Sequence, residues 1–102
     1  MITTHLGNYH TVTTDALYQW DKGQKLQIQG LTYNPIVHFA SKAVTKAYVI
    51  SPESYENDIA IIEIPDTLLE EPYDINAYVV DNDKTTHVIT IPVIARPEPD
   101  SV

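Results

Sequence analysis

The run Asp74-Ile75-Asn76-Ala77-Tyr78-Val79 alternates polar and apolar residues. That alternation is typical of a strand that lays one face on a hydrophobic core. The polar stretch Asp81-Asn82-Asp83-Lys84 follows as a turn, and residues 85–94 return as a longer run rich in β-branched side chains. Strand, short polar turn and strand in this order predict a hairpin.

The returning strand carries two further signals. Ile89, Ile91 and Val93 share one face, so that face is expected to point inward. Pro92 lies inside the run and cannot donate a backbone hydrogen bond. The strand is therefore expected to lie at a sheet edge or to bend at Pro92.

Upstream of the hairpin the chain reads as short β segments between turn residues, predicted at residues 17–20, 25–29, 36–40, 44–50 and 58–64. Segment 58–64 is nearly all apolar, which favours a strand buried on both faces or one with a bulge. Residues 65–71 begin with a proline and contain acids, which predicts one short helical turn. About seven strands and no helical periodicity predict an all-β fold, a two-sheet antiparallel β-sandwich.

The 102 residues are expected to form one domain with a tail. Residues 1–14 are rich in Thr and His without a clear pattern, and we expect an N-terminal arm or an edge strand there. Residues 15–95 would make the sandwich. In residues 96–102 prolines alternate with acids, which predicts an extended Pro-rich exit linker that orients whatever follows.

The composition is strongly acidic, with a formal net charge of −8 and no cysteine. Residues 51–83 hold ten acids and neither Lys nor Arg. Such a chain repels phosphate backbones, so nucleic-acid binding is not expected. No stretch approaches the ~20 apolar residues of a membrane span, so membrane insertion is not expected either. The acids either keep the surface soluble or form a face that docks a basic partner.

Residue types that carry chemistry are present, but not in the spacing that chemistry needs. Four histidines lack the spacing of a zinc site and are expected at the surface: His5, His10, His38 and His87. Of these, His38 and His87 fall at positions expected to face outward. Glu70 and Glu71 are adjacent, so their carboxylates are expected to diverge. With no nucleophile motif and no Gly-rich phosphate loop, we predict no catalytic, metal or cofactor site.

The pair Asp81-x-Asp83 resembles the start of a calcium-binding loop. Counting from Asp81, the sixth position is Thr86, where such a loop needs Gly, and the twelfth is Pro92, where it needs Glu. A hairpin turn is therefore the favoured interpretation of this segment.

Aromatic residues offer two further interpretations. Trp20 is the sole tryptophan and is expected to be a core or sheet-flank aromatic, with a contact at an assembly interface as the alternative. The seven tyrosines could form a carbohydrate- or protein-binding face. Four of them lie on or beside the central predicted strands and could sit half-buried there without a ligand: Tyr48, Tyr55, Tyr73 and Tyr78.

Four segments resemble, in order, the N-terminal domain of tail or baseplate proteins from phages and prophages of Gram-positive bacteria. They are Leu17-Tyr18-Gln19-Trp20-Asp21-Lys22-Gly23-Gln24-Lys25-Leu26, Val37-His38-Phe39-Ala40-Ser41, Ile64-Pro65-Asp66-Thr67-Leu68-Leu69, and Ile91-Pro92-Val93-Ile94-Ala95-Arg96-Pro97-Glu98-Pro99-Asp100. The family's exit usually reads Arg-Pro-Lys-Pro, so Glu98 replaces a lysine. It commonly leads into further domains, so this chain is expected to be either a separated domain or a short stand-alone version.

The resemblance implies an immunoglobulin-like sandwich that serves as a non-enzymatic structural or attachment module. Its partners would be other virion tail or baseplate proteins, with a homo-oligomer possible and no cofactor. It would be located in the virion tail after assembly in the bacterial host cytoplasm. The alternative is a carbohydrate- or host-receptor-binding module, since many β-sandwiches bind through exposed aromatics. A glycosidase fragment is a third interpretation, and it would need two carboxylates facing each other across a cleft.

Overall fold

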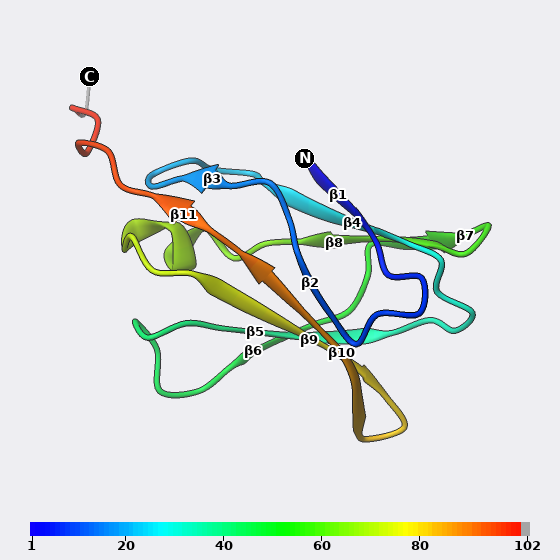
Figure 1. The fold of residues 1–102 in the computed structure, drawn as a ribbon. Coiled ribbons are helices and arrows are strands. Elements are labelled where there is room, and N and C mark those ends of the chain that lie inside the picture. Colours follow the sequence, from blue (N-terminus) through cyan, green and yellow to red (C-terminus); the bar gives the residue numbers. More distant parts are fainter. Residues whose placement is uncertain (101–102) are drawn as a thin grey trace.

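The computed structural model describes residues 1–100, in which two β-sheets pack face to face (Figure 1). One sheet has the strand order β1-β4-β8-β7 and the other β2-β10-β9-β5-β6, while β11 and β3 form a small separate pair. In chain order the elements are β1 (Ile2–His5), β2 (Thr11–Thr13), β3 (Leu17–Tyr18), β4 (Lys25–Gln29), β5 (Ile36–Ala40), β6 (Tyr48–Ile50), β7 (Ser54–Glu56), β8 (Ile59–Glu63), the 3₁₀ helix η1 (Asp66–Glu70), β9 (Ile75–Asp81), β10 (Lys84–Ile91) and β11 (Val93–Ile94). The predicted all-β sandwich is confirmed.

The core lies between the two sheets and follows the predicted alternation. Leu26 and Ile28 of β4 are fully buried, as are Val37 and Phe39 of β5. On β9 every second residue from Ile75 to Val79 is also fully buried. Each of these strands therefore turns its apolar face to the opposite sheet, because burial of that face supplies the main favourable free energy of folding.

Strand β8 settles the prediction for the apolar segment 58–64. It pairs with β4 from Lys25↔Glu63 to Gln29↔Ile59 without a register shift. Ala60 and Ile62 are fully buried and the intervening residues are half-buried. The segment is therefore a strand without a bulge, buried on its inner face and partly covered on its outer face.

Two tight turns have the backbone that two-residue hairpins require. Asn82 (φ 48°) and Asp83 (φ 65°) join β9 to β10, and Asn57 (φ 52°) and Asp58 (φ 62°) join β7 to β8. Positive φ at both central positions is the hallmark of a type I′ turn, and Asn and Asp tolerate it better than most side chains. The predicted hairpin at 81–84 is confirmed, so Asp81 and Asp83 belong to a turn.

The bend at Pro92 is confirmed. Strand β10 ends at Ile91, and the chain leaves the large sheet to pair as β11 with β3. Strand β10 itself is not at an edge, because β2 pairs with it on the far side from β9. Pro92 lacks the amide that would have continued the ladder, so the strand changes partner there.

The predicted helical turn is also confirmed. Helix η1 follows Pro65 and buries Leu68 and Leu69 completely. It connects β8 of one sheet to β9 of the other, so it closes one end of the sandwich with two leucines.

Three features differ from the sequence-based expectation. Residues 1–100 form eleven strands, where we expected about seven. The number is higher because several strands are only two or three residues long and are too short to leave a pattern in the sequence. Three strand pairs are parallel, where antiparallel pairs were expected: β1–β4, β2–β10 and β11–β3. These parallel pairs could not be predicted, because the alternation of residues within a strand carries no information on the direction of its partner. Residues 1–14 supply one edge strand to each sheet.

Two predicted strands are shorter than expected. Segment 17–20 contains only β3, because Trp20 adopts a positive φ of 74° and turns the chain. Segment 44–50 contains only β6, since residues 41–47 form the connection from β5 while Val44 still packs against the core. In both cases a β-branched or aromatic residue is partly buried although it lies in a loop. Hydrophobic periodicity and β-propensity cannot distinguish such a residue from one in a strand.

Candidate functional site

The C-terminal segment is fixed to the body of the sandwich by backbone hydrogen bonds. Strands β11 and β3 pair in parallel, Val93 with Leu17 and Ile94 with Tyr18. The Leu17 amide donates to the Pro92 carbonyl over 2.9 Å, and the Gln19 amide donates to the Ile94 carbonyl over 2.8 Å. The chain therefore leaves the sandwich in a direction set by a strand pair.

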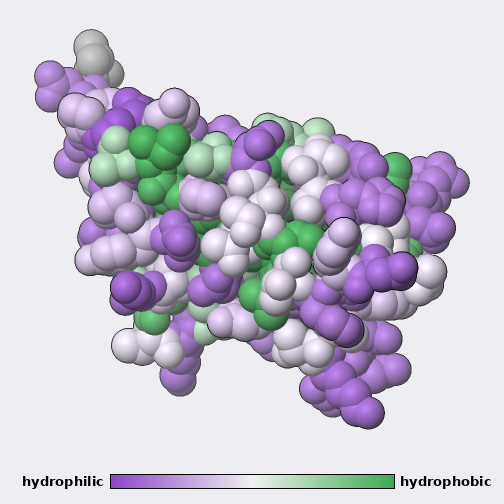
Figure 2. Space-filling model, in the orientation of Figure 1, coloured by the Kyte–Doolittle hydropathy of each residue, from purple (hydrophilic) through white to green (hydrophobic). Residues whose placement is uncertain are grey.

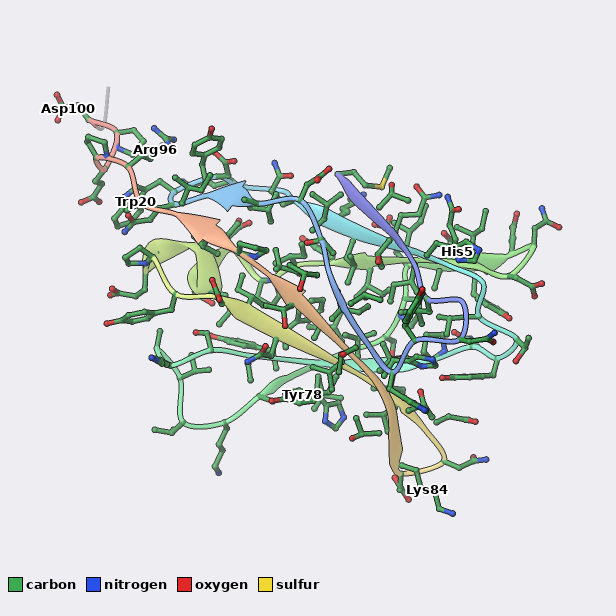
Figure 3. The ribbon with its side chains drawn as sticks, viewed as in Figure 1. His5, Trp20, Tyr78, Lys84, Arg96 and Asp100 are labelled. Atoms are coloured by element: carbon green, nitrogen blue, oxygen red, sulfur yellow. The ribbon has the colours of Figure 1, made fainter. Side chains whose placement is uncertain are left out.

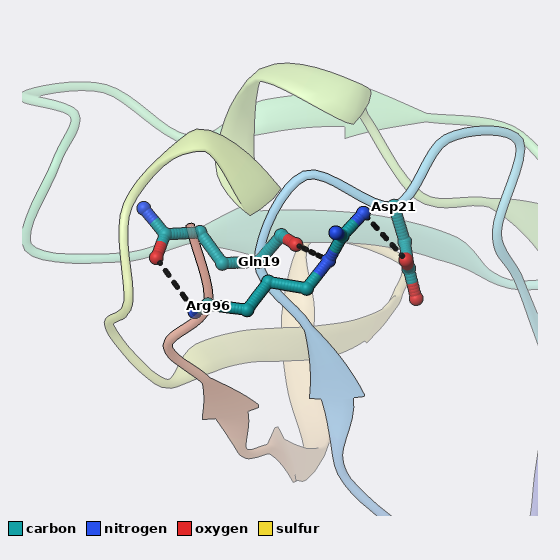
Figure 4. A network of polar contacts seen from close by, with 3 residues as sticks. All are labelled: Gln19, Asp21 and Arg96. Carbon is teal, nitrogen blue, oxygen red and sulfur yellow. Dashed lines mark hydrogen bonds and ion pairs between the residues drawn. The ribbon is translucent and has the colours of Figure 1, made fainter. Parts of the chain in front are cut away.

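Arg96 extends this attachment with its side chain (Figure 4). Its Nε donates to the backbone carbonyl of Gln19 over 2.8 Å, and its backbone amide donates to Oε1 of Gln19 over 3.3 Å. Its Nη2 lies 3.8 Å from Oδ1 of Asp21. Arg96 is the first residue of the predicted exit linker, and these contacts tie it to residues 19–21.

Helix η1 supplies the third side of the same corner. The Trp20 amide donates to the Leu69 carbonyl over 2.7 Å, and Nε2 of Gln19 donates to the Glu70 carbonyl over 2.9 Å. The Gly23 amide donates to Oδ1 of Asp66 over 2.9 Å. Residues 17–23, 66–70 and 92–96 thus meet at one end of the sandwich, and we call this region the exit corner.

A hollow of about 440 Å³ lies at the exit corner. It is lined by Trp20, Asp21, Lys22, Asp66, Glu70, Glu98, Pro99 and Asp100. Figure 3 shows Trp20, Arg96 and Asp100 at this end of the molecule, where the chain leaves the body. Trp20 is half-buried beside five carboxylates, so the prediction of a sheet-flank aromatic describes it better than a core position.

The exit corner is also where apolar surface is exposed. Tyr18 is 51% exposed and Ile94 is 45% exposed on the paired strands β3 and β11. Figure 2 shows apolar surface beside the hydrophilic C-terminal tail. An exposed apolar pair therefore lies next to the carboxylates that line the hollow.

The histidines do not gather into a site. Within the part of the chain that the structure describes, no group of three or more His, Cys, Asp or Glu side chains could hold a metal ion. His38 is half-buried on the outer face of β5, as expected. His87 was also expected to face outward, and that prediction is wrong. A bulge between Thr85 and His87 places His87 opposite Val79, whose side chain is buried.

His87 and His10 lie close together beside this bulge. Their ring centroids are 6.3 Å apart, and Nδ1 of His87 lies 3.0 Å from Oγ1 of Thr86. Partial burial lowers the pKa of His87, and the neighbouring His10 lowers it further. Thr86 also bonds to the hydroxyl of Tyr33 and donates to the Val79 carbonyl over 3.2 Å, so the bulge is held by side chains.

The outer face of the five-stranded sheet has a different character. Its outward positions follow from the registers of β2, β10, β9, β5 and β6 and alternate with the buried residues. These positions, which we call the neutral face, are Thr11, Thr13, Ile36, His38, Ala40, Val49, Asn76, Tyr78, Val80, Thr85, Val88 and Thr90. None of these residues is Asp, Glu, Lys or Arg, although the chain carries a net charge of −8.

Sequence reasoning singled out Trp20 and the exit segment that begins at residue 96, but it missed the part played by Gln19. Gln19 uses its backbone and its side chain to join the exit segment to η1. Its partners are 51 and 77 residues away in the chain. No local pattern encodes such a contact, so only the ordered occurrence of the three segments could have hinted at it.

Comparisons with known proteins find a likeness at the level of structure. No protein-family profile matches the sequence, and no curated protein matches it. Among solved structures the chain is similar to the N-terminal domain of ORF48 of phage TP901-1, with a TM-score of 0.49 and 14% sequence identity over 94% of this chain and 96% of that chain. No helix within residues 1–100 is long and apolar enough to cross a membrane.

Proposed function

We propose that this chain is a non-enzymatic structural module of a phage or prophage tail or baseplate, or its N-terminal attachment domain. It would act by shape, holding the segment that leaves it in a fixed direction relative to the sandwich. Its partners would be other tail or baseplate proteins, and its location would be the virion tail. The exit corner is the observation that carries this proposal.

Three of the four segments that resemble the tail-protein family meet at the exit corner. Residues 17–26, 64–69 and 91–100 are far apart in the sequence, yet backbone hydrogen bonds connect the first to each of the others. Segments with a common structural task would be expected to converge in this way. The task supported here is to anchor the exit segment.

The contacts at the exit corner suit a mechanical role. A parallel strand pair and the two bonds from Arg96 to Gln19 restrict the chain from residue 92 to residue 96. Hydrogen bonds to η1 in turn hold Gln19, Trp20 and Gly23. Beyond residue 96, Pro97 and Pro99 each fix φ and so reduce the freedom of the backbone. The five carboxylates of the hollow would attract a basic surface of a neighbouring protein.

The strand order supports an immunoglobulin-like fold for this module. Immunoglobulin-type sandwiches place strands A, B, E and D in one sheet and G, F and C, with C′ in the variable type, in the other. Taking β4 as B, β5 as C, β8 as E, β9 as F and β10 as G gives A-B-E-D and G-F-C-C′, with β2 added beside G. The parallel β1–β4 pair departs from the antiparallel sheets of that fold.

The direct test is to purify virions or tails from the source and to locate this chain in them. We expect mass spectrometry to find it in intact tails and gold-labelled antibody to mark it at the tail or baseplate in electron micrographs. Its absence from purified particles would contradict the proposal. Binding to host cell-wall polysaccharide by a chain that is absent from particles would favour the receptor-binding alternative instead.

A mutational test addresses the exit corner itself. Arg96→Ala removes the side-chain bond to Gln19 and should reduce incorporation into particles while the protein still folds. Lys25→Ala is the control, because it removes an exposed ion pair with Glu53 that does not involve the exit segment. Equal incorporation of both variants would show that the attachment of the exit segment has no part in assembly.

A further inference from the structure

Two histidines lie next to each other where β2 begins to pair with β10. Strand β2 runs parallel to β10 with Thr11 beside Val88, so His10 and His87 are the next neighbours along this pair of strands. Their ring centroids are 6.3 Å apart, and the amide of Val88 donates to the carbonyl of His10 over 2.8 Å. The two imidazoles therefore flank a hydrogen bond at the start of the β2–β10 pair.

We propose that this histidine pair is an acid-sensitive switch that controls whether β2 covers the edge of β10. Near neutral pH imidazoles are mostly uncharged, and β2 stays paired. When both rings take up a proton, like charges oppose each other across the two strands. Residues 7–16 then lift away from β10 as a loop that β1 and β3 still hold at its ends. This inference does not depend on the proposed function.

Strand β2 is the weakly held partner in this contact. It has three residues, and Val12 is the one that is partly buried and packs against the core. Strand β10 is held on its other side by β9, in a register that runs from Lys84↔Asp81 to Ile91↔Ile75. A segment with few buried apolar contacts opens more readily than the rest of a fold. Repulsion between the histidines is therefore expected to displace β2 and to leave β10 in place.

The parts of the chain on either side of this segment are held more firmly. Before it, Ile2 and Leu6 are buried in the core, and β1 pairs with β4 of the other sheet. After it, Leu17 is buried, and β3 pairs with β11. Gly7 begins the connection from β1 to β2 with a φ of 56°. Opening is therefore expected to stay within the stretch between β1 and β3 (Figure 1).

The surroundings of His87 supply a like charge. Val79 of β9 lies opposite it, and Tyr33 from the connection between β4 and β5 bonds to the neighbouring Thr86, which also bonds to Nδ1 of His87. Burial lowers the pKa of His87, and His10 lowers it further, while no other charged group within residues 1–100 contributes. The charged residues of these two strands nearest to it lie beyond the bulge, in the β9–β10 turn: Asp81, Asp83 and Lys84.

The direction of the pH dependence follows from these contacts. In the closed form, burial and His10 disfavour the charged form of His87, whereas opening exposes the ring to water. The open form therefore binds protons more readily, and its population rises as the pH falls below about 6.5, the ordinary pKa of histidine. At about pH 5.5, proton uptake by one histidine can raise the opening equilibrium by at most about tenfold.

Hydrogen exchange on the full chain measures this opening. The reporters are the amide of Val88, which donates to His10, and the amide of Thr14, which donates to the carbonyl of Thr90 over 3.0 Å. Both bonds break when residues 7–16 leave β10. We expect the protection factors of both amides, which correct for the intrinsic effect of pH on exchange, to fall several-fold between about pH 7.5 and about pH 5.5.

The amide of Ile64 is the reference for unfolding of the whole chain. It donates to the carbonyl of Gln24 over 2.9 Å, at the end of the β4–β8 pair in the other sheet. A local opening at β2 should lower the protection of Val88 and Thr14 more than that of Ile64. Equal falls at all three amides would overturn the proposal, because they would show that acid loosens the whole fold.

Substitutions of the exposed His10 give a graded test. His10→Asn removes the second charge, so the fall in protection at Val88 should be smaller than in the wild-type chain. His10→Glu places a carboxylate beside His87 and favours its charged form, so the fall should be smaller still. An equal fall in the wild-type chain and both variants would contradict the switch.

His38→Asn is the matched control for the loss of a histidine. His38 is half-buried on β5, which pairs with β6 and β9 and not with β2. This substitution should leave the fall in protection at Val88 unchanged, and a variant that abolishes the fall would place the sensitivity to acid elsewhere. Circular dichroism confirms that each variant is folded before exchange is measured.

Discussion

Phe39 is a fully buried aromatic on β5, paired with Ala77 of β9 on one side and Tyr48 of β6 on the other. Removing a large buried side chain loses its transfer free energy and leaves a cavity. We expect Phe39→Ala to lower the free energy of unfolding by about 3–5 kcal/mol, measured by urea denaturation. Trp20→Ala should cost less, because Trp20 is only half-buried. A loss below about 1 kcal/mol for Phe39→Ala would contradict its place in the core.

His87 makes the stability of the fold depend on pH. Its pKa in the folded chain lies below the value of about 6.5 expected in the unfolded chain, because burial and His10 disfavour its charged form. Below about pH 6.5 the unfolded state therefore binds more protons, and stability falls as the pH is lowered towards the pKa of the folded chain. Above that pH both states are neutral, and the contribution of His87 is fully present.

Urea denaturation at about pH 7.5 and about pH 5.5 tests this prediction. We expect the wild-type chain to lose more stability on acidification than His87→Asn, which cannot take up the proton. Nuclear magnetic resonance of the wild-type imidazole should show a titration midpoint below that of a free histidine. An identical loss of stability in both proteins would show that other groups account for the pH dependence.

At the scale of elements, the junction of β3, β11 and η1 is held by a small number of bonds. Arg96 is partly exposed, so its ion pair with Asp21 contributes little, and the bond from its Nε to the Gln19 carbonyl is the stronger contact. We expect Arg96→Ala to cost about 0.5–1.5 kcal/mol. The amide of Gln19, which donates to Ile94, should exchange with solvent faster in this variant.

Hydrogen exchange on the wild-type and variant chains measures this effect directly. Lys25→Ala, which removes only the exposed ion pair between β4 and Glu53, should leave the exchange rate of the Gln19 amide unchanged. Deleting residues 97–102 should barely change the melting temperature, because Pro97 to Asp100 are exposed and outside any strand. Residues 101 and 102 of the predicted linker lie outside the described part of the chain. Unchanged exchange in Arg96→Ala would mean that the β3–β11 pair alone holds the exit segment.

At the scale of the whole molecule, residues 1–13 join the two sheets along one side. Strand β1 covers the edge of β4 and β2 covers the edge of β10, while Ile2 and Leu6 are buried in the core. We expect deletion of these residues to cost roughly 3–6 kcal/mol from the two lost apolar side chains and to promote aggregation through the two uncovered edges. Thermal unfolding and light scattering on the truncated chain check both effects. A truncated chain as stable and monomeric as the full one would mean that the segment is a dispensable arm.

The sequence by itself determined the elements whose formation is local. Alternation along 25–29, 36–40 and 75–79 fixes which side chains face inward, since successive residues of a strand point to opposite sides. The turn residues at 82–83 and the proline at 92 fix where the chain reverses and where it leaves a sheet. Each of these signals lies within a few residues of the structure it produces.

Only the tertiary structure decided which strands became neighbours and in which direction. The parallel pairs made by β1, β2 and β11, the bulge before His87 and the contacts between Gln19 and Arg96 join residues that are distant in the chain. Hydrogen bonds of this kind depend on the positions that packing of the core gives to the backbone. The periodicity of hydrophobic residues along the sequence does not contain that information. The exit corner and the neutral face are therefore properties of the assembled sandwich, although every residue in them is visible in the sequence.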